Sequence, residues 1–247
     1  MHPTIGMEVC SHLVVSGLTP DRHLIEVRYA RRLALLDYLG AIADELGDTY
    51  AEYDIMSDNA RFSSPEEGAD LVVGVDRVAL VREGGREVTT LAALAQAMEV
   101  VQKFLGVTHV DYVGARQVLL VPLDDVAEAT SWFRERLFDY RSGAFEAIGD
   151  EPVEAQLIVA SRVHGGRCRL RVTSVYSGRK PANLDADQIP GALLVDVDRS
   201  DDTGCDVWQI EARVQDLLTD GFRRAVDFYA RLDESHTKED HPVVGHG

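Results

Sequence analysis

The sequence contains little cysteine and no long apolar run. Its three cysteines, Cys10, Cys168 and Cys205, are far apart and include no CxxC pair, which argues against a disulfide framework or a cysteine zinc site. No window approaches the ~20 apolar residues that a membrane-spanning helix needs. The first residues also lack the basic segment and apolar run of a secretory signal. These absences predict a cytoplasmic protein with reduced cysteines.

Basic residues are scarce relative to acidic ones. The 247-residue chain has 25 Lys and Arg against 42 Asp and Glu, which gives a formal net charge of −17 at pH 7. So acidic a surface repels the phosphates of nucleic acids and anionic lipids. We therefore expect neither nucleic acid nor a membrane as a partner.

The short motifs of common catalytic sites are missing as well. The sequence has no G-x-S-x-G, P-loop, GxGxxG or HExxH pattern, and no histidine lies four residues from a second metal-binding histidine. Strand alternation places Cys168 on a core face, where a thiol usually serves packing alone. The sequence therefore gives no coherent set of catalytic residues.

What is present is a series of short β-type runs and a few helical segments. Apolar alternation predicts strands at 9–16, 23–29, 70–76, 77–83, 107–122, 152–163, 167–177 and 192–198. Helical periodicity predicts helices at 31–46, 91–105, 124–140 and 207–232, with Thr90 as an N-cap and Gly106 after a helix end. The polar composition of 18–21 and 57–68 predicts a turn and a loop. Strands joined by turns, without regular βαβ alternation, predict an α+β fold with largely antiparallel sheets packed by helices.

The order of these elements divides the chain into two similar halves. A polar, glycine-bearing stretch at 141–152 separates an amino-terminal α+β half, 1–145, from a carboxy-terminal α+β half, 150–234. The last segment, 235–247, has few apolar residues and is predicted to be a disordered tail.

The first candidate site is the acidic stretch LLVDVDRSDDTG at 193–204. A calcium loop that starts at Asp196 fails, because its sixth position is Asp201 instead of glycine and its twelfth is Val207. Asp196 and Asp198 share one strand face, ~7 Å apart. With a third acid such as Asp185 or Asp187 they could hold Mg²⁺ for a hydrolase or phosphotransferase. The alternative is a solvated strand end followed by an acidic turn.

The second candidate site is the stretch RCRLRV at 167–172. Arg167, Arg169 and Arg171 share one face of a strand, and Arg162 extends the row across the hairpin around 164–166. In so acidic a protein such a row can bind an anionic ligand or an acidic partner protein. The competing interpretation is an outward face neutralised by Glu154 and other nearby acids. We favour a non-enzymatic, cofactor-free protein that binds a partner or ligand at this row.

The final helix bears on self-association. At ~26 residues it would be ~39 Å long, more than a small domain usually spans. It can pack lengthwise across a sheet, or extend beyond it and pair with a second copy. We expect a homo-oligomer.

Three features together resemble a known family. They are the strand at 107–121 with Gly-Ala-Arg at its centre, the late strand ALLVDVD, and the terminal helix carrying Phe222 and Phe228. They are similar to those of an uncharacterised, sporadically distributed prokaryotic family of similar length. Its members pair a central Gly-φ-Arg strand with a late Leu-Asp-φ-Asp strand before a terminal helix. In this chain valine replaces the leucine before Asp196. The resemblance implies no activity, since none is established for that family.

Overall fold

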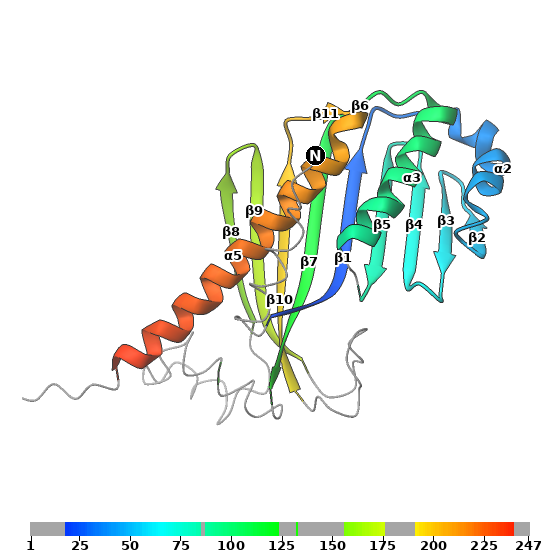
Figure 1. The fold of residues 1–247 in the computed structure, drawn as a ribbon. Coiled ribbons are helices and arrows are strands. Elements are labelled where there is room, and N and C mark those ends of the chain that lie inside the picture. Colours follow the sequence, from blue (N-terminus) through cyan, green and yellow to red (C-terminus); the bar gives the residue numbers. More distant parts are fainter. Residues whose placement is uncertain (1–17, 85–86, 124–131, 133–155, 176–190, 240–247) are drawn as a thin grey trace, which may run out of the picture.

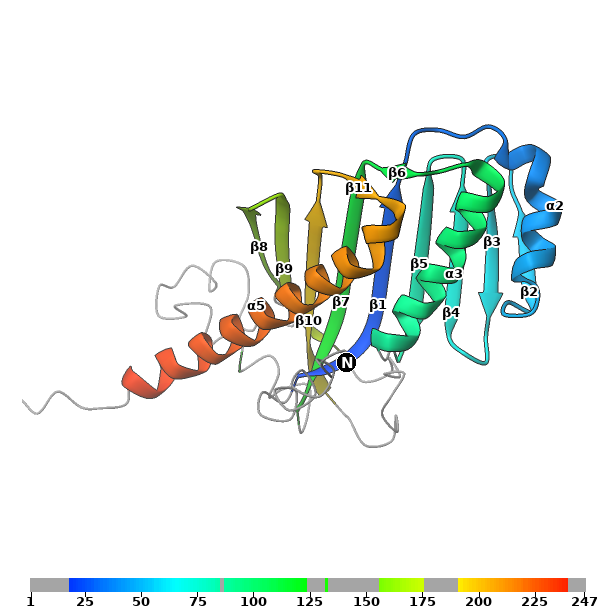
Figure 2. The same cartoon turned by 45° about the horizontal axis from the view of Figure 1, so that its top comes forward.

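A computed structural model describes residues 18–84, 87–123, 132, 156–175 and 191–239. Its centre is a nine-stranded antiparallel sheet in the order β2-β3-β4-β5-β1-β7-β10-β9-β8, and helices α2, α3 and α5 cover one face of it (Figures 1 and 2). The strands are β1 (Thr19–Arg28), β2 (Glu52–Ile55), β3 (Asn59–Ser64), β4 (Ala69–Gly74), β5 (Arg77–Glu83), β7 (Tyr112–Leu123), β8 (Gln156–Val163), β9 (Gly166–Val175) and β10 (Gly191–Asp201). The helices are α2 (Leu35–Leu46), α3 (Glu87–Leu105) and α5 (Ile210–Glu239). The expected α+β fold with antiparallel strands is confirmed.

Two apolar clusters lie between the sheet and its helices. The larger packs α2, α3 and the start of α5 on β1, β3, β4 and β5, with Ile42, Leu80 and Val101 fully buried. The smaller lies under the middle of α5 and contains Leu193 and Phe222. Where helices cover one face of the sheet, strands such as β1 and β3 alternate buried and accessible residues.

Several elements differ from the sequence predictions. Residues 59–64, expected within a loop, form β3, in which Ala60, Phe62 and Ser64 are buried against the helices. The expected turn at 18–21 is mostly the start of β1, with a register shift between Pro20 and Arg22. Thr90 is not an N-cap, because α3 begins at Glu87. The prediction for Gly106 is confirmed, since it follows α3 with a φ of +62°.

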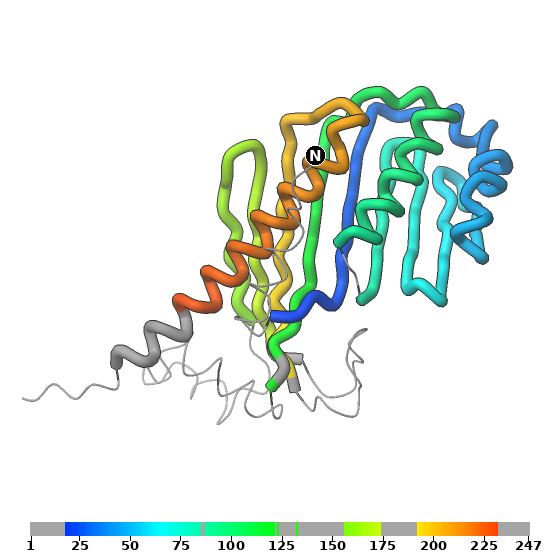
Figure 3. The backbone as a smooth tube through the Cα atoms, in the orientation of Figure 1, coloured from blue at the N-terminus to red at the C-terminus, as the bar shows by residue number. Residues whose placement is uncertain are grey.

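Strands from both halves of the chain join in one sheet. β10 pairs with β7 along its full length, although about 70 residues separate them in sequence (Figure 3). The hairpin of β8 and β9 is confirmed and continues the sheet beyond β10. A short pair, β6 (His109–Val110) with β11 (Cys205–Asp206), adjoins the main sheet. The predicted strand at 9–16, the boundary at 141–152 and all of the helix at 124–140 except Trp132 lie outside the described residues. The two-domain division stays a prediction.

Helix α5 crosses β7 and β10 diagonally, and its carboxy-terminal end extends past β8 (Figures 1 and 2). Gly221 faces the sheet, where a Cβ would lie 3.3 Å from Arg199 Cγ and 3.4 Å from Val197 Cγ1. Farther along, Tyr229 stacks on Trp132 at a ring-centroid distance of 5.5 Å. The helix is drawn to Glu239, so it includes the first residues of the predicted tail. Residues 240–247 lie outside the described residues, and the disorder of the tail stays a prediction.

The start of α5 is preceded by a short 3-10 turn, Val207–Gln209. Asp206 and Gln209 form a reciprocal capping pair there, and Trp208 between them is 78% exposed. No helix in the described part of the chain is both long and apolar enough to span a membrane.

Candidate functional site

The candidate site lies on the face of the sheet opposite the helices. We call it the open face because no described helix packs on it, although Val118, Leu120, Ala192 and Leu194 form a small buried cluster on the same face. The described helices pack on the other face, which carries Val195 and Val197 of β10 and Leu170 of β9. Alternation turns Asp196 and Asp198 the opposite way. The arginines of β9 join them, because Arg171 is paired with Asp196, Arg169 with Asp198 and Arg167 with Ser200. The two candidate sites of the sequence analysis are therefore parts of one site.

Asp196 is clamped between two guanidinium groups from the strands on either side. Arg116 Nε donates to Asp196 Oδ1 at 2.6 Å, and Arg116 Nη2 donates to Oδ2 at 2.6 Å. Arg171 Nη2 lies 2.7 Å from the same Oδ2. The Asp196 side chain is only 6% exposed, whereas Arg116 and Arg171 are 38% and 32% exposed. A buried carboxylate needs such partners, and this one has two.

Sequence reasoning missed Arg116. It is the only charged residue between Val113 and Leu123, and strand alternation gives it the face of Gly114 and Val118. A single arginine in so apolar a strand indicates an acidic partner on a neighbouring strand. Arg116 is the arginine of the Gly-Ala-Arg segment, but the sequence pattern alone indicated no role for its side chain.

Asp198 occupies the next open-face position on β10. It is half-buried, and its carboxylate makes no hydrogen bond with any residue in the described ranges. Burial raises its pKa above the usual range and outweighs the opposing charge of Arg116, while the nearby Asp196 adds to the increase. Asp198 therefore takes up a proton more readily than an exposed aspartate does.

A pocket of about 120 Å³ opens between these side chains. Its lining is formed by Arg116, Arg169, Arg171, Asp196 and Asp198. Arg171, which lines the pocket, has a buried Nε without an acceptor among the described residues. A buried N–H of this kind costs free energy until an acceptor reaches it.

The outer arginines of the row are free of ion pairs with the part of the chain that the structure describes. Arg162 is paired with Arg167 across the β8–β9 hairpin, and both side chains are exposed, as is that of Arg169. The predicted common face of the four arginines is confirmed by the register. Glu154, the acid expected to neutralise them, lies outside the described residues, and the acids beside the row are Asp196 and Asp198.

The acidic stretch is not the solvated strand end considered in the sequence analysis. β10 continues to Asp201, so Asp196 and Asp198 lie within the strand. Within the described ranges, no group of three or more His, Cys, Asp and Glu side chains is placed to hold a metal. Asp185 and Asp187 lie outside them. The Mg²⁺ site stays a prediction, and the guanidiniums around Asp196 count against it because they repel a cation.

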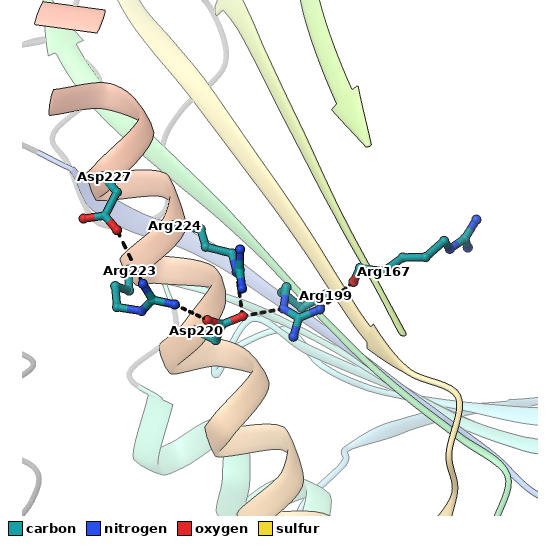
Figure 4. A network of polar contacts seen from close by, with 6 residues as sticks. All are labelled: Arg167, Arg199, Asp220, Arg223, Arg224 and Asp227. Atoms are coloured by element: carbon teal, nitrogen blue, oxygen red, sulfur yellow. Dashed lines mark hydrogen bonds and ion pairs between the residues drawn. The ribbon is translucent and has the colours of Figure 1, made fainter. Parts of the chain in front are cut away.

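A second ionic network joins the sheet to α5 on the helix-covered face (Figure 4). Buried Arg199 donates from Nε to Asp220 Oδ2 at 2.8 Å and from Nη1 to the carbonyl oxygen of Arg167 at 2.7 Å. Arg223 and Arg224 also donate to Asp220. Burial opposes ionisation of Asp220, but these hydrogen bonds and the charge of Arg199 outweigh it and lower its pKa. Arg199 links β9 to Asp220 of α5, so we assign the network to docking of the helix on the sheet.

Two further side chains that could take part in catalysis, His23 and Cys168, are both buried and lie apart from each other. His23 of β1 lies under α3, where burial lowers its pKa to about 4 and its Nδ1 is 3.3 Å from Thr90 Oγ1. Cys168 is buried on the core face as predicted, and burial raises the pKa of its thiol. A thiol in this state is a poor nucleophile at neutral pH.

Comparison with protein-family models and with curated proteins finds no match to this chain.

Proposed function

We propose that this protein binds an acidic partner protein through the arginine row, Arg162, Arg167, Arg169 and Arg171, on the open face of the sheet. This role requires no chemical reaction, because exposed cations held at fixed spacing by a rigid sheet are sufficient for binding. We therefore propose a non-enzymatic protein. The observation that carries it is the exposure of Arg162, Arg167 and Arg169 on one face with no ion pair in the described part of the chain.

The geometry favours an extended anionic segment. Alternate residues of a strand lie ~7 Å apart, a spacing closer to that of successive acidic side chains than to one small ion. Arg162 on β8 widens the row beside Arg167, so the cationic strip covers two strands. Because the net charge of the chain is −17, this strip is a local exception that an acidic partner would select.

The test uses a fluorescein-labelled glutamate-rich peptide and fluorescence anisotropy. We expect binding that weakens as salt rises, because charges on exposed groups are screened beyond ~8 Å at physiological ionic strength. The triple variant Arg162→Gln, Arg167→Gln, Arg169→Gln should lose this binding. Its folding should barely change, since exposed substitutions usually cost within ~0.5 kcal/mol each.

A matched control removes the same charge elsewhere. Arg31, Arg32 and Arg231 are also exposed and lie off the row, so their replacement by glutamine changes the net charge equally. The control variant should keep most of the peptide affinity. Equal losses in the two triple variants would mean that net charge alone governs binding, and the proposal would then be wrong.

The proposal includes self-association through the end of α5. This helix runs for 30 residues, and its carboxy-terminal end reaches past β8 (Figure 1). A helix end without a sheet beneath it can pack on the same segment of a second copy. Light scattering over a dilution series should give a mass above that of the monomer at micromolar concentration. A strict monomer there would remove this part of the proposal.

A further inference from the structure

At the inner end of the arginine row, we propose that the pocket between Arg116, Arg169 and Arg171 binds one tetrahedral oxyanion, a phosphate group carried by the acidic partner or free in solution. This inference rests on the proposed function and deepens it, because it names the chemistry that the partner would present. The rest of the row then contacts ordinary carboxylates on either side of that group.

The first support is that two of the three guanidiniums are already fixed. Asp196 holds Arg116 by two hydrogen bonds and Arg171 by one, at 2.6 to 2.7 Å. These bonds use Nε and Nη2 of Arg116 but only Nη2 of Arg171. The other N–H groups of Arg116 and Arg171 donate no hydrogen bond to the described residues. Asp196 therefore serves as a positioning residue that leaves donors available. Donors held in place before binding lose little conformational entropy when the anion arrives.

The second support is the unsatisfied donor. Arg171 Nε is buried with no acceptor in the described part of the chain, and Arg171 lines the pocket. The Arg171 side chain as a whole is 32% exposed. A small rotation of its guanidinium would bring this unsatisfied N–H to an anionic oxygen in the pocket and form a charge-assisted hydrogen bond. A pocket of about 120 Å³ has room for one such anion.

The third support is that the donors come from two separate strands. Arg116 projects from β7, whereas Arg169 and Arg171 project from β9, with β10 between them. Donors that converge from two sides suit the several oxygens of a tetrahedral dianion better than the two coplanar oxygens of a carboxylate. Phosphate and sulfate meet this requirement.

Asp198 makes the site sensitive to pH. Its carboxylate would repel a dianion beside Arg169, whereas its protonated form could donate a hydrogen bond to it. The charged and titratable groups that face Asp198 are Arg116 and Tyr112 of β7, Asp196 of β10, and Arg167 and Arg169 of β9. Binding should therefore take up a proton and tighten as pH falls towards the range in which Asp198 titrates.

The experiment measures sulfate binding by calorimetry on the full chain at constant ionic strength, with chloride as the reference anion. Sulfate stays a dianion throughout the accessible pH range, so any pH dependence belongs to the protein. Arg169→Gln should weaken sulfate binding about tenfold, the effect of one lost charge-assisted hydrogen bond. The control Arg162→Gln, on the same face but outside the pocket, should change it less than about twofold.

Asp198→Asn supplies an independent readout. It keeps the shape of the side chain and removes its charge, so sulfate should bind about threefold more tightly at neutral pH. The tightening that the parent protein shows on acidification should disappear in this variant. Unchanged sulfate affinity in both Arg169→Gln and Asp198→Asn would overturn the pocket assignment.

A peptide arm separates the two sources of the oxyanion and the two proposals. Two glutamate-rich peptides differ only in one serine, free or phosphorylated. Preference for the phosphorylated peptide, lost in Arg169→Gln, assigns the pocket to a group on the partner. Sulfate binding without peptide binding supports the pocket and contradicts the proposed function. Peptide binding through Arg162 and Arg167, without sulfate binding or phosphate preference, supports the proposed function and contradicts the pocket assignment.

Discussion

At the scale of single residues, Asp196 shows how a buried charge can be retained in a sheet. Its carboxylate is almost fully buried, yet Arg116 and Arg171 satisfy both of its oxygens. The two arginines are each about one-third exposed, so solvent screens part of the attraction. The main effect of Asp196 is therefore to orient its neighbours, with a smaller contribution to stability.

The substitution Asp196→Asn tests this balance. The amide keeps the shape but removes the charge, so the contacts of the buried Asp196 side chain with two partly exposed guanidiniums are weakened. We expect the free energy of unfolding to fall by about 2 kcal/mol, within the range for hydrogen bonds to charged groups. Urea unfolding measures the change. As a control, Asp202→Asn alters an exposed aspartate just after the end of β10 and should cost less than about 0.5 kcal/mol. Equal losses of stability in the two variants would mean that the contacts of Asp196 with Arg116 and Arg171 do not stabilise the fold.

His23 gives a separate expectation for pH. Its pKa is lowered by burial to about 4 in the folded chain, against 6.5 for an unperturbed histidine. Between these values the unfolded chain binds more protons, so stability decreases as pH falls from 6.5 to 4. The His23 contribution to this loss is at most about 3 kcal/mol.

The measurement compares the parent protein with His23→Leu in urea at several pH values. Carboxylates such as Asp220 also lose favourable contacts in acid, but they do so in both proteins. The free energy of unfolding of the parent protein should therefore fall relative to that of His23→Leu as pH is lowered from 7 to 4. Parallel curves would mean that His23 does not remain neutral in the folded state.

At the scale of elements, the seating of α5 depends on one glycine. Gly221 lies where the helix crosses the sheet, and a Cβ there would meet Arg199 and Val197 at 3.3 to 3.4 Å. A larger side chain would push the helix outward and strain the bonds of Arg199 to Asp220 (Figure 4).

We predict that Gly221→Val lowers the free energy of unfolding by about 2 kcal/mol, as overpacking does. Gly40 offers the opposite case, because a Cβ at this position in α2 meets nothing within 4 Å. Gly40→Ala should raise stability by up to about 1 kcal/mol through helix propensity. Thermal and urea unfolding measure the stability of both variants. A Gly221→Val protein as stable as the parent would show that α5 can shift on the sheet without cost.

The sequence was most informative where periodicity was local. Alternation placed Arg167 and Arg169 on one face, and helical spacing found the cores of α2, α3 and α5. It failed at β3, because Asn59 and the serines that follow are typical of loops, and only tertiary burial of Phe62 makes the segment a strand. The joining of Asp196 with Arg171 could not be predicted, because the register between β9 and β10 is a long-range property that no local pattern encodes.

At the scale of the whole molecule, the continuous sheet couples the two halves of the chain. β7 pairs along its length with β1 on one side and with β10 on the other. Loss of either neighbour would leave the middle strand with an open edge and uncover an apolar cluster.

We therefore predict one cooperative thermal transition for the full chain. Calorimetry should give equal calorimetric and van't Hoff enthalpies, the signature of two-state unfolding. The Gly221→Val change should shift that transition as a whole, because α5 contacts both β7 and β10. Two separate transitions would show that the sheet is divided energetically at β7, in favour of two domains.

The two tryptophans differ so much in surroundings that they form a ready optical probe of the fold. Trp208 is 78% exposed just before α5, whereas Trp132 is buried and stacked on Tyr229 near the other end of that helix. Emission from Trp208 should lie at long wavelength and be quenched by acrylamide, while Trp132 should emit at shorter wavelength and resist quenching. In a Trp208→Phe protein, a red shift would then report release of the distal half of α5 without any added label.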